Sequence, residues 1–103
     1  EINFWLPLTP VWDSNSLYFE SAPGRGDFTP FNLRYGEIGR FWGSQCLHYT
    51  VPNETGVCRV SFDFRVIPRS CFVEQFSGGN RPDGRLLFDI GGFFGWLDAE
   101  GNE

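Results

Sequence analysis

The stretch CRVSFDFRV, residues 58–66, decides the fold class of this chain. Apolar side chains at Val60, Phe62, Phe64 and Val66 alternate with polar side chains at the positions between them. Successive side chains of a β-strand point to opposite faces of the sheet. The alternation therefore predicts a strand that has one apolar face and one polar face.

The remainder of the chain also has the pattern of a β protein. Short segments rich in aromatic and β-branched residues lie between turns of proline, glycine and asparagine, and no segment has a helical period. Further strands are expected at residues 2–6, 17–21, 38–42, 46–51 and 86–90, with a loop over 29–35. Many short strands with frequent turns predict an all-β sandwich or jelly roll.

The composition limits the classes of partner. A chain of 103 residues predicts one domain, with core strands in residues 1–68 and a C-terminal extension in residues 69–103. The net charge of −5 argues against nucleic acid as a partner, although all eight basic residues are arginine. No apolar run approaches the ~20 residues that cross a membrane, so we expect no membrane partner. Three widely spaced cysteines and no signal peptide predict reduced thiols in a cytoplasmic protein.

The start of the chain is unusual because the sequence contains no methionine and opens directly on a predicted strand. We expect truncation of a longer protein. A sheet without its leading strands exposes edges that pair with other chains, so association through strand edges is also expected.

Three residues are candidates for binding chemistry. His48 is the only histidine, and a lone histidine is more often a hydrogen-bonded structural residue than a metal ligand. Arg59 and Ser61 share the polar face of the strand at 58–66. That face either meets solvent or lines a cavity, where an arginine fork would bind a carboxylate and the serine hydroxyl would add a third hydrogen bond. Periodicity does not separate these alternatives.

A family resemblance favours the second alternative. The runs INFWLPLTPVWDSNSLYFESAPG (2–24) and GEIGRFWGSQCLHYTVPNETGVCRVSFDFRV (36–66) resemble the iron- and 2-oxoglutarate-dependent oxygenases. They look most like the phytanoyl-CoA hydroxylase-like branch, in particular its streptomycin-biosynthesis-type oxygenases, over residues 1–68. The resemblance implies a double-stranded β-helix (a jelly roll or cupin-like fold), here a partial one that lacks its leading strands. It also implies Fe(II) and 2-oxoglutarate as cofactors.

The resemblance also implies roles for individual residues. His48 matches the second iron-binding histidine of the family. Arg59 matches the residue that pairs with the far carboxylate of 2-oxoglutarate, and Ser61 matches the hydroxyl that assists it. Asn3 and Trp5 lie on a strand that lines the pocket in the family, so they are weaker candidates for contact with the cosubstrate or substrate.

One part of the family pattern is missing. Members hold iron with two histidines and one carboxylate, and a His-x-Asp or His-x-Glu motif supplies the first two ligands. Carboxylates are present at Asp13, Glu20, Asp27 and Asp63, but there is no second histidine. The resemblance therefore implies that the motif lies upstream of Glu1.

The resulting hypothesis is the C-terminal segment of an oxygenase that hydroxylates a small-molecule substrate and that is inactive as this segment alone. A metal-free jelly-roll module that binds a small molecule or sugar is the alternative. A structural domain without a ligand is the third option.

Overall fold

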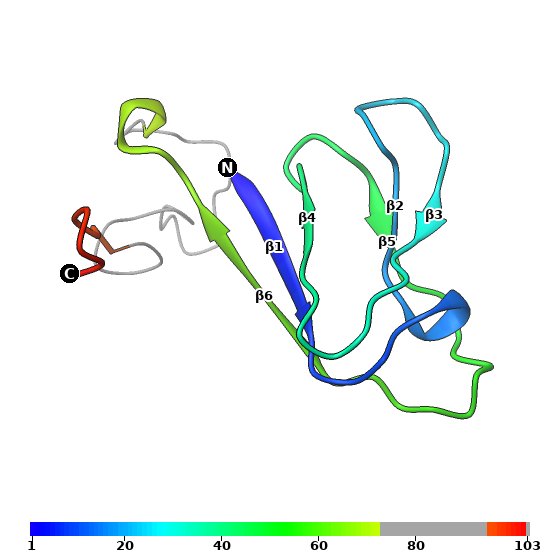
Figure 1. The fold of residues 1–103 in the computed structure, drawn as a ribbon. Helices are drawn as coiled ribbons and strands as arrows, with labels where there is room; N and C mark the ends of the chain where they lie inside the picture. The colour runs from blue at the N-terminus through cyan, green and yellow to red at the C-terminus, as the bar shows by residue number, and fades with distance from the viewer. Residues whose placement is uncertain (73–94, 103) are drawn as a thin grey trace, which may run out of the picture. The chain divides into compact units, whose positions relative to one another are not determined.

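The computed structural model describes residues 1–72 and 95–102. The chain forms two compact units, Glu1–Pro68 and Arg69–Glu103. The first unit contains all the strands of the described residues, and Figure 1 shows their arrangement. In the described part of the second unit, residues Arg69–Cys71 form a short 3-10 turn, and Arg69 and Phe72 contact the ring of Trp96. The strand expected at 86–90 lies outside the described residues.

The first sheet is antiparallel and is centred on β1 (Ile2–Pro7), the strand predicted at residues 2–6. One neighbour is β4 (Gly39–Phe41), and the other is β6 (Ser61–Val66). The pairing of β1 with β6 runs over six residues, from Ile2 opposite Val66 to Pro7 opposite Ser61. This pairing is the longest of the described part of the chain, and it fixes which β6 side chains share a face with those of β1.

The second sheet is also antiparallel and contains three two-residue strands. Its order is β3 (Thr29–Pro30), β2 (Tyr18–Phe19) and β5 (His48–Tyr49). Along the chain, β1 lies in the first sheet, β2 and β3 in the second, and the chain then returns to the first for β4, the second for β5 and the first for β6. The described part of the chain is thus mostly β, as predicted, with two layers visible in Figure 1.

The strands predicted at residues 17–21, 38–42 and 46–51 are shorter in the structure, and two other differences have a reason in hydrogen bonding. Residues 29–35 are not all loop, because Thr29 and Pro30 pair with β2 and Leu33 pairs with Val11. The last strand begins at Ser61 rather than at residue 58. The N–H of Val60 donates to the hydroxyl of Thr9 (3.1 Å), so a side chain replaces the backbone partner that a continued ladder would need.

The core lies between the two sheets. Trp5 of β1, Val11 and Phe41 of β4 are buried, and Phe19 and Phe31 pack against them. Phe31 is central, with ring centroids 5.6 Å from Trp5, 4.0 Å from Phe19 and 6.0 Å from Phe41. Aromatic contacts at these distances add to the stabilisation from area burial. The faces of β1, β2 and β4 that carry these rings are therefore the inner faces of the sandwich.

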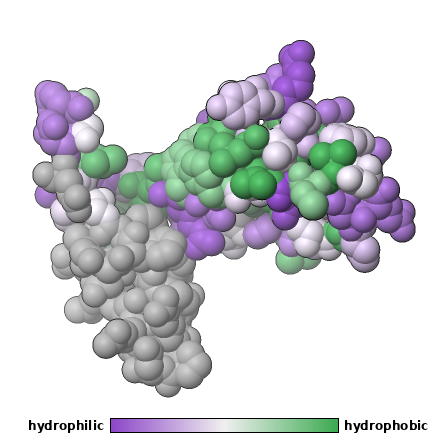
Figure 2. All heavy atoms as spheres, turned by 90° about the horizontal axis from the view of Figure 1, so that it is seen from below, coloured by the Kyte–Doolittle hydropathy of each residue, from purple (hydrophilic) through white to green (hydrophobic). Residues whose placement is uncertain are grey.

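The apolar side chains of β6 point away from this core. Residues directly opposite each other in an antiparallel pair share a face, and Phe64 lies opposite Phe4 with ring centroids 5.2 Å apart. Phe62, Phe64 and Val66 are between 41% and 49% exposed. We call this surface the outer sheet face; its members are Ile2, Phe4, Leu6, Phe62, Phe64 and Val66. Figure 2 shows apolar side chains gathered in a patch on one side of the molecule.

The polar side chains of β6 consequently lie on the opposite face of the first sheet, which is the face that carries Trp5. Ser61 is opposite Pro7 and Asp63 is opposite Trp5, and both β1 residues are buried. The predicted alternation is thus present in the structure. Both faces of β6 are partly exposed: the side chain of Asp63 is 51% exposed on the side of Trp5, and Phe64 is 44% exposed on the outer sheet face.

Candidate functional site

The guanidinium of Arg59 is held by two contacts at the inner side of the first sheet. Arg59 lies in extended chain two residues before β6 and is half-buried. Its Nη1 donates a hydrogen bond to the backbone carbonyl of Asn15 (3.1 Å), and its central carbon lies 5.5 Å from the ring centroid of Trp5. Asn15 ends the 3-10 turn Asp13–Asn15, and its buried side chain accepts a hydrogen bond from the N–H of Trp12 (2.8 Å). This turn therefore presents a carbonyl to the arginine.

No carboxylate pairs with Arg59 among residues 1–72 and 95–102. The ion pairs found there are Arg25–Asp27 (3.6 Å), Arg34–Glu37 (3.1 Å) and Arg65–Asp63 (3.9 Å). Asp63, the carboxylate nearest to Arg59 in the sequence of this strand, thus lies near Arg65. A guanidinium has five N–H donors, and one hydrogen bond to Asn15 leaves most of those of Arg59 available for an anion.

Two other candidate residues lie on β6 and β1: Ser61 is opposite Pro7, and Asn3 is opposite Arg65 near the other end of the same pairing. Ser61 is the first residue of β6 and follows Arg59 by two positions. Asn3 is buried, at 4% exposure, and its Oδ1 has no hydrogen-bond partner within the described structure. A Cβ added to Gly43 would lie 2.6 Å from Cγ of Asn3, so a glycine is needed for the amide to fit. Buried polar atoms are normally paired, and the Asn3 oxygen is therefore available to a donor.

His48 lies on β5 of the second sheet and is exposed. It is opposite Phe19 in the β2–β5 pairing, and its ring makes an edge contact with Phe41 (5.1 Å between centroids). Its Nδ1 lies 3.1 Å from the backbone carbonyl of Cys46. A carbonyl only accepts hydrogen bonds, so in a neutral ring this contact places the proton on Nδ1 and leaves the lone pair on Nε2. The side chain has the tautomer that a metal bound at Nε2 requires.

The two predicted residues therefore lie against one aromatic core. Arg59 covers Trp5 and His48 contacts Phe41, and the ring of Phe31 connects these two aromatic residues. A hollow of about 210 Å³ adjoins Phe41 as well, but neither Arg59 nor His48 lines it. The shared cavity for both residues remains a prediction.

The metal-ligand set is incomplete in the described part of the chain. Residues 1–72 and 95–102 contain no group of three or more histidine, cysteine, aspartate or glutamate side chains placed to hold a metal ion. Cys46, two residues before His48, is buried at 5% exposure, and all three cysteines are free thiols. His48 is thus a candidate for a single ligand, and the other ligands would have to come from elsewhere.

Glu20 is a structural residue whose position the sequence analysis did not predict. Its side chain is 2% exposed and accepts hydrogen bonds from the N–H of Leu47 (2.7 Å) and of Gly26 (3.0 Å). These two hydrogen bonds, the one from Leu47 first, hold the pKa of Glu20 below its ordinary value of 4.5. The sequence offered one indication of this role, because Glu20 lies at the end of a predicted strand and just before a glycine-rich loop.

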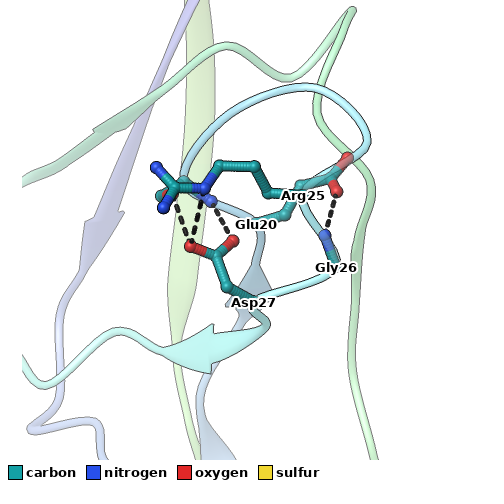
Figure 3. A network of polar contacts seen from close by, with 5 residues as sticks. Glu20, Arg25, Gly26 and Asp27 are labelled. Atoms are coloured by element: carbon teal, nitrogen blue, oxygen red, sulfur yellow. Dashed lines mark hydrogen bonds and ion pairs between the residues drawn. The ribbon is translucent and has the colours of Figure 1, made fainter.

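The loop after Glu20 is closed by its own polar side chains (Figure 3). Asp27 accepts hydrogen bonds from the N–H (3.0 Å) and the hydroxyl (2.6 Å) of Ser21, and its carboxylate lies 3.6 Å from Nε of Arg25. The Ser21 hydroxyl is the larger cause that lowers the pKa of Asp27. The Arg-Gly-Asp sequence is therefore part of a closed turn, in which the aspartate already has partners.

Comparison with known proteins shows partial homology over 70% of the chain. A streptomycin biosynthesis protein of Streptomyces griseus, StrG, is 39% identical over 72 residues, which are 70% of this chain and 33% of that protein. The chain therefore spans about a third of the length of this relative. No family profile matches the chain, and no solved structure matches it. In the described residues, no helix is long and apolar enough to span a membrane.

Proposed function

We propose that this chain is part of an iron- and 2-oxoglutarate-dependent oxygenase and supplies the site for the far carboxylate of 2-oxoglutarate together with one iron ligand. The observation that carries the proposal is the half-buried guanidinium of Arg59. It is oriented by Trp5 and by the carbonyl of Asn15, and it has no carboxylate partner in the described structure. A partly buried arginine of this kind is suited to an external anion.

The chemistry of the donors favours a carboxylate. The planar guanidinium can donate two parallel hydrogen bonds to the two oxygens of one carboxylate. The hydroxyl of Ser61, two residues after Arg59, would supply a third donor. Asn3 and Trp5, both buried on the neighbouring strand, would form the floor beneath the bound acid.

His48 would supply Nε2 to the iron. The hydrogen bond from Nδ1 to the Cys46 carbonyl fits this role, because metal-bound histidines commonly donate their other ring N–H to a carbonyl or carboxylate. When bound, the iron provides the redox chemistry that activates oxygen. The remaining ligands, a histidine and a carboxylate, would come from a part of the longer protein outside these residues.

The sheet arrangement supports a jelly roll that lacks its leading strands. The chain moves repeatedly from one sheet to the other, as expected for a jelly roll. Strands β6 and β5, which carry Ser61 and His48, each lie at the edge of their sheet in the described structure. Additional strands of the longer protein would pair with these two edges and bring further ligands beside His48.

The relative supports a role in the biosynthesis of a small molecule, since StrG is a streptomycin biosynthesis protein. We propose that the longer protein hydroxylates a small-molecule intermediate of such a pathway.

The carboxylate site can be tested on the chain itself by NMR titration with 2-oxoglutarate. Resonances of Arg59 Nε–H and of the Trp5 indole N–H should shift, with a dissociation constant on the order of millimolar because only one end of the acid is held. Arg59→Lys removes the fork and one charge-assisted hydrogen bond, so the affinity should fall about tenfold or more. Arg34→Lys is the matched control, since Arg34 is exposed and paired with Glu37. Equal affinity of the Arg59→Lys variant and the wild type would contradict the proposal.

The proposed iron site can be tested only in the longer protein. The DNA upstream of Glu1 is expected to encode His-x-Asp or His-x-Glu. A protein extended to include that motif should bind Fe(II) under nitrogen and should lose this binding in a His48→Ala variant. The alternative function, a metal-free binding module, is favoured by the lack of a three-ligand group in the described residues. It predicts that ligand binding by the extended protein is indifferent to Fe(II).

A further inference from the structure

The carboxylate of Glu20 is connected to the ring of His48 through a single peptide group. Oε1 of Glu20 accepts the N–H of Leu47 at 2.7 Å. The carbonyl of the same peptide group belongs to Cys46, and it accepts the Nδ1–H of His48 at 3.1 Å. One rigid, planar unit thus lies between a buried negative charge and the imidazole.

A second contact joins Glu20 to Leu47 through the following peptide group. The N–H of Glu20 donates to the carbonyl of Leu47 (3.2 Å), so both backbone groups of Leu47 are bound to the same glutamate. The other carboxylate oxygen of Glu20 accepts the N–H of Gly26 (3.0 Å), visible in Figure 3. Gly26 has a φ of +68°, a backbone conformation that favours glycine. The loop after β2 therefore holds the carboxylate from the side opposite to Leu47.

We propose that Glu20 is a positioning residue for His48, acting through the Cys46–Leu47 peptide group to set the tautomer and orientation of the imidazole. The charge strengthens the effect, because a carboxylate bound to the N–H polarises the amide and makes its carbonyl a better acceptor. A stronger acceptor at Nδ1–H raises the electron density at Nε2, the atom available to a metal. The proposed consequence for metal binding rests on the proposed function; the effect on the ring does not.

The lone histidine makes the proposal directly measurable. Two-dimensional ¹H–¹⁵N spectra through two- and three-bond couplings distinguish the two neutral tautomers, and His48 is the only source of imidazole signals. In water a free neutral histidine side chain favours the Nε2–H tautomer. At alkaline pH the wild-type chain should show mainly Nδ1–H, and Glu20→Ala should shift the population several-fold towards Nε2–H.

Two further variants separate positioning from a general loss of folding. Glu20→Asp keeps the charge but shortens the side chain, so the hydrogen bond to Leu47 should be lost and the tautomer should change as in Glu20→Ala. Glu20→Gln keeps one acceptor oxygen and should retain more of the Nδ1–H form than Glu20→Asp. Glu37→Gln is the control, because Glu37 accepts a backbone N–H of Arg34 (2.7 Å) in an exposed turn.

The outcome is decisive in either direction. A wild-type tautomer in folded Glu20→Asp and Glu20→Ala variants, with unchanged hydrogen exchange of the Leu47 amide, would overturn the proposal. If Glu20→Ala does not fold, the comparison of Glu20→Asp with Glu20→Gln decides. The tautomer measurement uses neither metal nor 2-oxoglutarate, so its result does not depend on the proposed function. Absence of binding in the titration with 2-oxoglutarate would refute the proposed function alone.

Discussion

Replacing Trp5 with leucine should weaken both the core and the orientation of Arg59, because one indole ring contacts both. The ring is 5% exposed, lies 5.6 Å from the ring of Phe31 and has the Arg59 guanidinium at 5.5 Å. Leucine keeps an apolar side chain at the position but provides no π face for either neighbour.

The expected loss can be divided between these contacts. The aromatic pair with Phe31 contributes about 0.5–1.5 kcal/mol beyond area burial. The cation–π contact with a half-exposed Arg59 contributes about 0.5–1 kcal/mol. Adding the cavity that a smaller side chain leaves, the free energy of unfolding should fall by about 2–4 kcal/mol.

A double-mutant cycle isolates the Arg59 contribution. Urea unfolding of the wild type, Trp5→Leu, Arg59→Met and the double variant should give a coupling energy of about 0.5–1 kcal/mol. Arg34→Met combined with Trp5→Leu is the control and should give no coupling, since Arg34 is exposed and paired with Glu37. A coupling between Trp5 and Arg59 that is indistinguishable from zero would refute the claim that the indole orients the guanidinium. The 2-oxoglutarate affinity of Trp5→Leu should then also equal that of the wild type.

Three further predictions follow from other contacts. Gly43→Ala places a Cβ 2.6 Å from Cγ of Asn3 and should lower stability by about 1–3 kcal/mol through overpacking, which a thermal melt would detect; an unchanged melting temperature would contradict it. Asp27 has a folded-state pKa below its ordinary value of 3.8 because of its hydrogen bonds from Ser21, so its contribution to stability is complete above that value and is lost as pH falls through the folded-state pKa. Urea unfolding across the acid range should show this loss, and Asp27→Asn should show a flatter profile. Phe64→Glu on the outer sheet face, where Phe64 is 44% exposed, should reduce self-association of the isolated chain in sedimentation experiments, and equal association of both proteins would be the opposing result.

The strands of the first sheet were largely predictable from local pattern. Residues 2–6 and 58–66 contain enough alternation and β-branched or aromatic side chains to predict β1 and most of β6. The short β3 was not predictable, because Thr29 and Pro30 are extended through pairing with β2 rather than through their own propensity. The start of β6 was also displaced by a side-chain hydrogen bond, from Val60 to Thr9, which no period reveals.

The candidate site was predictable in part. The residue types of Arg59, Ser61 and His48 carry the chemistry, and the family resemblance, not periodicity, indicated that they act together. The structure adds the contacts that orient them, from the carbonyl of Asn15 and the carbonyl of Cys46. Backbone carbonyls are the same in every residue, so a sequence gives no signal for which one will be used.

The two-residue period of a strand is a local property, and the amino-acid sequence by itself determined which side chains of β6 share a face. Only the tertiary structure decided that the polar face lies on the same side as Trp5, because β6 pairs with β1 and Trp5 packs against Phe31 in the core that contains Phe41. The same holds for Glu20 and Leu47, which are 27 residues apart in sequence. The pairing of β2 with β5 brings these two residues together. A hydrogen bond forms only when donor and acceptor are about 3 Å apart, so this one depends on the folded structure.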